Sequence, residues 1–162
     1  MRINLGAFVA APIQDVFAFF DDPANTLEFN THARRFEVVA VQPDGRRTID
    51  FEMNSGAKTW MQTVEQEVRE PPTKLVTRGG TWTSDRRTFL MTVTTDRSFS
   101  VEGDGTRLDV TVEFRLDQPW RRPFWTVLSW IQRGATQLEL EHQLYYMTDL
   151  IAARHKRNAS IE

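Results

Sequence analysis

The stretch from Pro123 to about Asn158 constrains the fold more than any other part of the sequence. It contains no proline after Pro123 and only one glycine, Gly134. Apolar residues recur along it at the spacing of an α-helix, and such a helix would be about 50 Å long. Because this length exceeds the radius of a small domain, we expect the rest of the chain to form a large surface beneath the helix.

Two apolar rows follow this predicted helix and make its apolar face wide. The row that we expect to face inward comprises Val127, Leu128, Ile131, Gly134, Ala135, Leu138, His142, Tyr145 and Ala152. A flanking row comprises Trp130, Leu140, Leu144, Met147 and Ile151. Basic residues at the end of the segment, Arg154, Lys156 and Arg157, suit the negative pole of a helix dipole.

The N-terminal part predicts one strand and two short helices. Arg2 to Ala10 alternates weakly between apolar and polar residues, which favours a strand. Pro12 suits the first turn of a helix that we expect to run to Phe20. Asp22 can cap a second short helix, from Pro23 to Phe29.

From Arg34 to Leu116 the pattern has a period of two residues and predicts six strands joined by hairpins. Pro43-Asp44-Gly45 and Gly103-Asp104-Gly105 are strong turn signals. Pro71-Pro72 closes one strand, and we expect Gly79-Gly80 to break or bend the next. Short connections favour an antiparallel meander, and the alternation indicates that one face is covered. The long helix is the element that can cover it.

Composition narrows the class of protein. At 162 residues, with 40% hydrophobic and 11% aromatic residues, we expect one domain over residues 1–162 with a substantial core. The net charge of −2 shows no basic excess, so we do not expect nucleic-acid binding. The chain has no cysteine, which excludes disulfides and thiolate metal sites. We see no signal peptide or transmembrane segment and expect a cytoplasmic protein.

Four segments in combination resemble a known family. Ala11 to Phe17 reads APIQDVF after the first strand, and Asp22 to Phe29 forms the next short helix, with Phe29 where the family usually has tryptophan. Val64 to Val76 contains a strand, two prolines and a strand, and Gly103 to Leu108 forms the last hairpin. Together they resemble the START and polyketide cyclase/dehydrase superfamily, also called SRPBCC, which includes the birch-pollen allergen type.

This resemblance implies an α+β helix-grip fold, in which a seven-stranded antiparallel curved sheet surrounds a long C-terminal helix. Two short helices follow the first strand, and a cavity lies between the sheet and the long helix. The superfamily includes lipid carriers, hormone receptors and cyclases, so the resemblance specifies function poorly. It supplies no invariant catalytic motif.

Side-chain alternation in the strands and the inward row of the helix predict the residues that line this cavity. Those from the strands are Phe51, Met53, Trp60, Gln62, Phe89, Met91 and Phe114. Those from the helix are Ile131, Leu138, His142 and Tyr145. Mostly apolar walls with a few polar groups are typical of a small-molecule site.

The polar members of this set have two interpretations each. Gln62 and Gln66 are at inward positions, where they would bind a polar group of a ligand, unless a bulge turns them to solvent. His142 and Tyr145 are candidates for proton transfer, although a histidine in an apolar row is more often a structural residue. Arg97 is also at an inward position, but a buried arginine needs a carboxylate, so we expect a bulge to turn it outward.

No metal site is expected, since the three histidines lack a ligand spacing, and no nucleotide or other cofactor motif is present. Aromatic residues are concentrated between Trp120 and Trp130. They are interpreted either as packing at the helix start or as a lid, an interfacial anchor or a homodimer contact.

Three functions remain open. The first is binding of a small hydrophobic or aromatic molecule, lipid- or polyketide-like, in the cavity. The second is a polyketide cyclase or dehydratase without metal or nucleotide, in which His142 or Tyr145 would move protons. The third is a protein-partner-binding module that uses the segment from Trp120 to Trp130. We rank binding first because the sequence shows no paired carboxylates and no second histidine beside His142.

Overall fold

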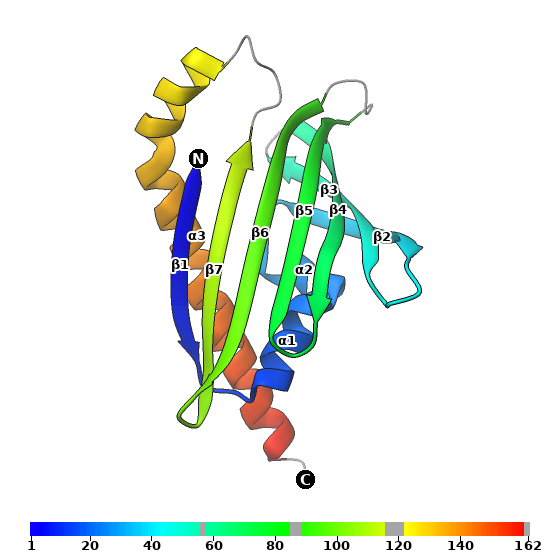
Figure 1. Cartoon of the computed structure of the whole chain (residues 1–162), viewed down its shortest axis with the longest axis vertical. Helices are drawn as coiled ribbons and strands as arrows, with labels where there is room; N and C mark the ends of the chain where they lie inside the picture. Colours follow the sequence, from blue (N-terminus) through cyan, green and yellow to red (C-terminus); the bar gives the residue numbers. More distant parts are fainter. Residues whose placement is uncertain (56–57, 85–88, 116–121, 161–162) are drawn as a thin grey trace.

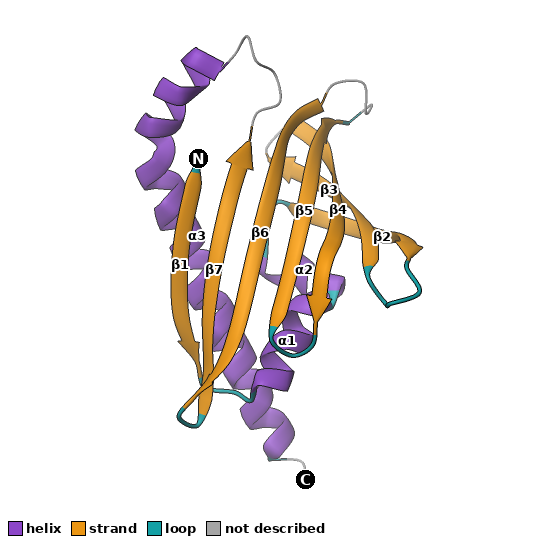
Figure 2. Ribbon diagram, in the orientation of Figure 1, coloured by secondary structure: helices purple, strands orange, loops and turns teal. Residues whose placement is uncertain are grey.

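The computed structural model describes residues 1–55, 58–84, 89–115 and 122–160, without the side chains of residues 55, 89–90 and 122–132. Seven antiparallel strands form one curved sheet, and three helices lie on one side of it (Figures 1 and 2). The strands are β1 (Arg2–Val9), β2 (Ala33–Val41), β3 (Arg47–Ser55), β4 (Lys58–Glu70), β5 (Lys74–Thr83), β6 (Phe89–Glu102) and β7 (Gly105–Arg115). The helices are α1 (Ile13–Asp21), α2 (Pro23–Phe29) and α3 (Arg122–Ala159).

The sheet is a meander with one exception. Its strand order is β1-β7-β6-β5-β4-β3-β2, so β2 to β7 follow one another and β1 pairs with the last strand. Leu5 in β1 lies opposite Val110 in β7. The two-residue connection between β6 and β7 contains Gly103 at a φ of 59°, a left-handed conformation that glycine adopts readily. The predicted helix-grip α+β architecture is confirmed.

One strand continues through the two glycines at which a break or a bend was expected. Gly79 and Gly80 belong to β5 and pair with Val64 and Thr63 of β4 on one side and with Val93 and Thr92 of β6 on the other. Hydrogen-bonded neighbours on both edges hold these glycines in the sheet despite their low strand propensity. The glycine at position 79 instead leaves space on the inner face of the sheet.

The short helices begin as the sequence predicts. The carboxylate of Asp22 accepts a hydrogen bond from the backbone N–H of Ala24 at 2.9 Å and caps α2, which has Pro23 at its first position. The side chain of Asn25 donates to the carbonyl of Phe19 at 2.8 Å and ties α2 to α1. The two helices therefore form a compact layer under the lower half of the sheet (Figure 1).

The orientation of α3 differs from the prediction. Its buried apolar side chains among residues 133–159 are Leu144, Met147 and Ile151, which are 3%, 9% and 3% exposed and belong to the flanking row. Leu138 and Tyr145, from the row expected inside, are 69% and 63% exposed. The prediction of the inward face was therefore wrong by roughly one residue, or about 100° of helix rotation. The aliphatic row covers the sheet, while the tyrosine hydroxyl stays in water.

The apolar core consists of two clusters. The larger joins α1, β1, β7 and the second half of α3 through residues such as Val16, Phe17, Leu108 and Leu144. The smaller lies between β2 and β3 and contains Ala33, Ile49, Phe51 and Met53. Residues of both clusters border the cavity described below, so the sheet is braced on either side of a hollow interior.

Candidate ligand-binding cavity

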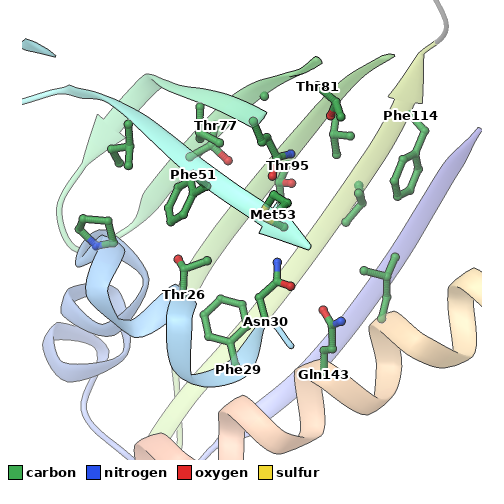
Figure 3. Close-up of a pocket in the computed structure, with 18 of the residues that line it drawn as sticks. Thr26, Phe29, Asn30, Phe51, Met53, Thr77, Thr81, Thr95, Phe114 and Gln143 are labelled. Carbon is green, nitrogen blue, oxygen red and sulfur yellow. The ribbon is translucent and has the colours of Figure 1, made fainter. Parts of the chain in front are cut away.

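A cavity of about 870 Å³ lies between the inner face of the sheet and the helices. It extends along β4 and β5 from Lys58 and Ser84, which are exposed, to Asp21 and Gln66, which are buried beside α1. One end therefore reaches the surface and the other is closed by the short helices. Figure 3 shows side chains of the sheet above the space, with Thr26 and Phe29 of α2, Asn30 directly after that helix and Gln143 of α3 opposite them.

Small side chains at the centre of the sheet keep this space open. Thr77, Gly79 and Thr81 alternate along the inner face of β5, and Thr95 lies on the inner face of β6 opposite Thr77. A row of leucine or phenylalanine at these positions would fill the volume that the threonines leave. The cavity is therefore built into the sequence of β5 and β6.

Six of the predicted residues line the cavity: Phe51, Met53, Trp60, Gln62, Met91 and Phe114. All six belong to strands, where a side chain's face follows from the alternation of two. The side chains of Phe89 and Ile131, which were also predicted, lie outside the described part of the chain. That these residues contact a ligand remains a prediction.

Three predicted residues of α3 do not line the cavity. Leu138, His142 and Tyr145 are exposed on the outer side of the helix, as the change in helix orientation requires. The helix contributes Leu140, Gln143, Leu144 and Met147 instead. Three of these residues, Leu140, Leu144 and Met147, belong to the flanking row, whose spacing in the sequence is as regular as that of the row expected inside.

Gln62 extends its amide over Gly79. A Cβ atom at position 79 would lie 3.0 Å from Nε2 of Gln62, so glycine provides the room for this side chain. Among the described residues no hydrogen-bond partner of the Gln62 amide is found. The side chain is half-buried, so a water molecule or a polar group of a ligand can reach its amide.

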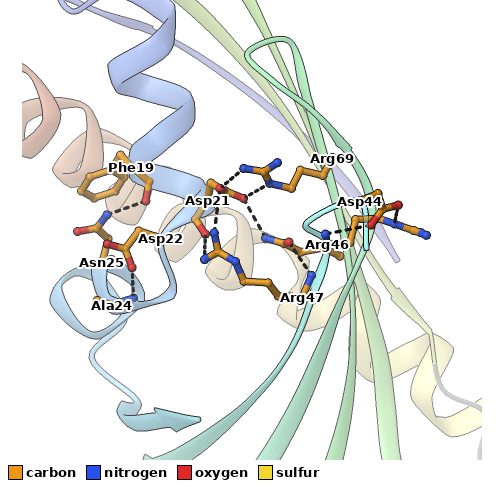
Figure 4. A network of polar contacts seen from close by, with 10 residues as sticks. Phe19, Asp21, Asp22, Ala24, Asn25, Asp44, Arg46, Arg47 and Arg69 are labelled. Atoms are coloured by element: carbon orange, nitrogen blue, oxygen red, sulfur yellow. Dashed lines mark hydrogen bonds and ion pairs between the residues drawn. The ribbon is translucent and has the colours of Figure 1, made fainter. Parts of the chain in front are cut away.

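Gln66, the other predicted glutamine, has a structural role at the closed end. Its Nε2 donates to Oδ1 of Asp21 at 3.2 Å, and its Oε1 accepts from the backbone N–H of Arg47 at 2.9 Å. Arg69 donates to both oxygens of Asp21, at 2.9 and 2.8 Å, and Arg47 reaches Oδ2 at 3.3 Å (Figure 4). This network attaches the end of α1 to β3 and β4.

Asp21 stays ionised in this network. Burial alone would raise the pKa of its carboxyl, but the hydrogen bonds and charge of Arg69, the charge of Arg47 and the Gln66 hydrogen bond together hold that pKa below its usual value. Its side chain is 10% exposed. The sequence shows the aspartate only as a candidate helix cap, because its three partners are distant in the chain.

Arg97 lies inside the cavity, contrary to the expected outward bulge. It pairs in register with Leu75 of β5 and Val110 of β7, so β6 keeps its alternation through this position. Its guanidinium lies 5.4 Å from the ring centre of Phe20, and Nη1 donates to Oγ1 of Thr77 at 3.3 Å. Burial lowers the pKa of Arg97 to about 10, although Asp96 acts in the opposite direction.

The described residues show neither a metal site nor a membrane-spanning helix. Within the described residues, no group of three histidine, cysteine, aspartate or glutamate side chains is placed to hold a metal ion. None of the described helices is long and apolar enough to cross a membrane. The aromatic side chains from Trp120 to Trp130, predicted as a possible homodimer contact, lie outside the described residues.

Comparisons with known proteins agree with the resemblance found in the sequence. A family model described as polyketide cyclase/dehydrase and lipid transport matches residues 3–142. No curated protein matches the chain in sequence.

Solved structures share the fold at low sequence identity. A START superfamily protein from Mycobacterium smegmatis has a TM-score of 0.64 at 14% identity, with 96% of this chain and 97% of that one covered. The di-domain ARO/CYC protein BexL, from the BE-7585A biosynthetic pathway, has a TM-score of 0.68 at 17% identity, covering 96% of this chain and 50% of BexL. Ara h 8.0201 has a TM-score of 0.61 at 12% identity, covering 91% and 98%.

Proposed function

Because the chain belongs to the polyketide cyclase/dehydrase and lipid transport family, we propose that it binds a small, mostly apolar molecule in the cavity between the sheet and α3. The observation that carries this proposal is the open volume of about 870 Å³ between two apolar clusters. Ligand sites of drug-sized molecules typically occupy about 300–1,000 Å³. A lipid- or polyketide-like molecule suits these dimensions.

Affinity would come from contact between the ligand and the apolar walls. Burial of apolar surface contributes about 25 cal/mol per Å² before the costs of association are subtracted. Phe51, Met53, Trp60 and Phe114 supply such surface from three strands of the sheet. The Gln62 amide would orient a polar group of the ligand, because a partner there satisfies its hydrogen-bonding capacity.

The two residues that the cyclase hypothesis requires for proton transfer do not line the cavity. His142 and Tyr145 are on the outer side of α3, away from the cavity. Asp21, the carboxylate that lines the cavity among the described residues, is held by Arg69 and Arg47. Binding therefore remains the better-supported function, and the cytoplasmic location stays a prediction.

Titration with the neutral fluorophore N-phenyl-1-naphthylamine tests the proposal. We expect saturable binding at one molecule per chain, with increased fluorescence. Thr95→Phe places a ring in the cavity, so it should weaken binding at least ten-fold. Thr94→Phe adds the same ring to the outer face of β6 and is the matched control, which should change affinity less than two-fold. Absence of saturable binding by the natural sequence, or equal affinity in both variants, would contradict the proposal.

A further inference from the structure

Arg97 is a half-buried cation that forms no ion pair with an acidic side chain among the described residues. Its guanidinium has five N–H donors, and one of them donates to Thr77 at 3.3 Å. Phe20 covers one face of the group, with its ring centre 5.4 Å from Cζ. Part of the side chain still faces the open space of the cavity, so the remaining donors are accessible to a bound molecule.

Among the described residues, no acidic side chain forms an ion pair with Arg97. Asp21 accepts hydrogen bonds from Gln66, Arg47 and Arg69 on its two oxygens. Asp96 follows the opposite face of β6, where its Oδ2 lies 3.7 Å from Nζ of Lys74 and its Oδ1 has no hydrogen-bond partner among the described residues. Arg47 and Arg69 therefore share the Asp21 carboxylate, while Arg97, which lines the cavity, has no such partner.

Leaving such a charge unpaired in an apolar interior is unfavourable. The cost is recovered only when a hydrogen-bonded anion lies beside the charge. At neutral pH the group is a cation even though burial lowers its pKa to about 10. A bound anion would therefore compensate the charge of the Arg97 guanidinium, which no described carboxylate pairs with.

We propose that Arg97 binds a carboxylate at one end of the ligand, so that the molecule enters the cavity with its acidic group toward α1. This inference rests on the proposed function. Thr77 and Thr95 lie opposite each other on β5 and β6, and their inward hydroxyl groups flank the same region (Figure 3). The apolar remainder would extend past Met53 and Phe114 toward the exposed end.

A planar guanidinium suits this role because it can donate two parallel hydrogen bonds to one carboxylate. Hydrogen bonds to charged groups are about twice as strong as neutral ones. Removing the arginine should therefore weaken a carboxylate ligand by about ten- to a hundred-fold. A neutral ligand of equal length should lose little.

Decanoate and decan-1-ol provide a matched pair of probes, measured by displacement of N-phenyl-1-naphthylamine. In Arg97→Met, we expect decanoate affinity to fall about ten- to a hundred-fold and decan-1-ol affinity to change less than three-fold. Arg78→Met is the control, because Arg78 lies on β5 but outside the cavity, 55% exposed and paired with Glu67. It removes the same charge and should leave both affinities nearly unchanged.

The outcomes separate the two proposals. Equal loss of both probes in Arg97→Met, or no loss of either, would overturn the carboxylate site while leaving the cavity as a binding site. Failure of the fluorophore and of both probes to bind the natural sequence would overturn the proposed function itself.

A measurement on the natural sequence covers the case in which Arg97→Met does not fold. In a crystal structure of the decanoate complex, a carboxylate oxygen should lie within about 3 Å of the Arg97 guanidinium. A carboxylate found at the Lys58 end of the cavity instead would overturn the inference.

Discussion

At the scale of single residues, Asp21 connects the helical layer to the sheet. It is the last residue of α1, and its partners Arg47, Gln66 and Arg69 belong to β3 and β4. Because both arginine side chains are mostly shielded, at 28% and 23% exposed, loss of the carboxylate would leave two cations poorly compensated. The network is therefore expected to matter for stability.

We expect Asp21→Asn to lower the free energy of unfolding by about 3 kcal/mol at pH 7, the usual cost of breaking a buried ion pair. Urea unfolding followed by circular dichroism measures this change. Asp109→Asn is the control, since Asp109 pairs with Arg107 on the surface and is 59% exposed. A loss in Asp21→Asn no larger than that of the control would show that the network contributes little.

The same carboxylate predicts an acid dependence. Its pKa is lower in the folded protein than in the unfolded chain, so the unfolded chain binds more protons in this range. The stability that Asp21 contributes is present above its unfolded pKa, about 3.8, and is lost as pH falls through the lower folded value. Urea unfolding between pH 5 and 2.5 should show a steeper loss in the natural sequence than in Asp21→Asn. Parallel curves would contradict this assignment.

At the scale of elements, α3 shows how far sequence patterns reach. The position of the helix and the seven strands could be predicted, because alternation from Leu108 to Phe114 and turn glycines such as Gly103 are local signals. The orientation of α3 could not, because both of its rows are apolar. Which row is buried depends on its fit to β1 and α1, which is a tertiary property.

The lining of the cavity could likewise be predicted only in part. Strand alternation identified Phe51, Trp60 and Gln62, since each strand residue has only two possible faces. At Arg97 the alternation was correct, but we set it aside because we expected a buried charge to be paired within the protein. The pairing rule holds for a complete molecule, including its ligand. The carboxylate that we propose for Arg97 would satisfy this rule.

The orientation of α3 can be tested with two leucines. Leu144→Ala should lower the free energy of unfolding by about 2–5 kcal/mol, because Leu144 is 3% exposed and packs in the larger cluster. Leu138→Ala should change it by less than about 0.5 kcal/mol, since Leu138 is 69% exposed. Chemical unfolding of both variants measures the difference. The reverse order would restore the originally predicted face.

At the scale of the whole molecule, occupation of the cavity should stabilise the fold. A ligand that binds only the folded state raises the free energy of unfolding by about 1.4 kcal/mol at ten times its Kd. N-phenyl-1-naphthylamine at this concentration should therefore raise the thermal midpoint of the natural sequence by a few degrees. Thr95→Phe should show a smaller shift at the same concentration. Equal shifts in both proteins would indicate binding elsewhere on the surface.

The division of the core into two clusters has a consequence for evolution. Val16, Leu108 and Leu144 on one side, and Ile49 and Phe51 on the other, maintain the fold. Positions such as Thr81 and Met91 line the cavity and belong to neither cluster. Substitutions there can accumulate across generations without collapse of the scaffold. Proteins that share this fold can therefore diverge in ligand specificity, and the fold can be retained after sequence similarity is lost.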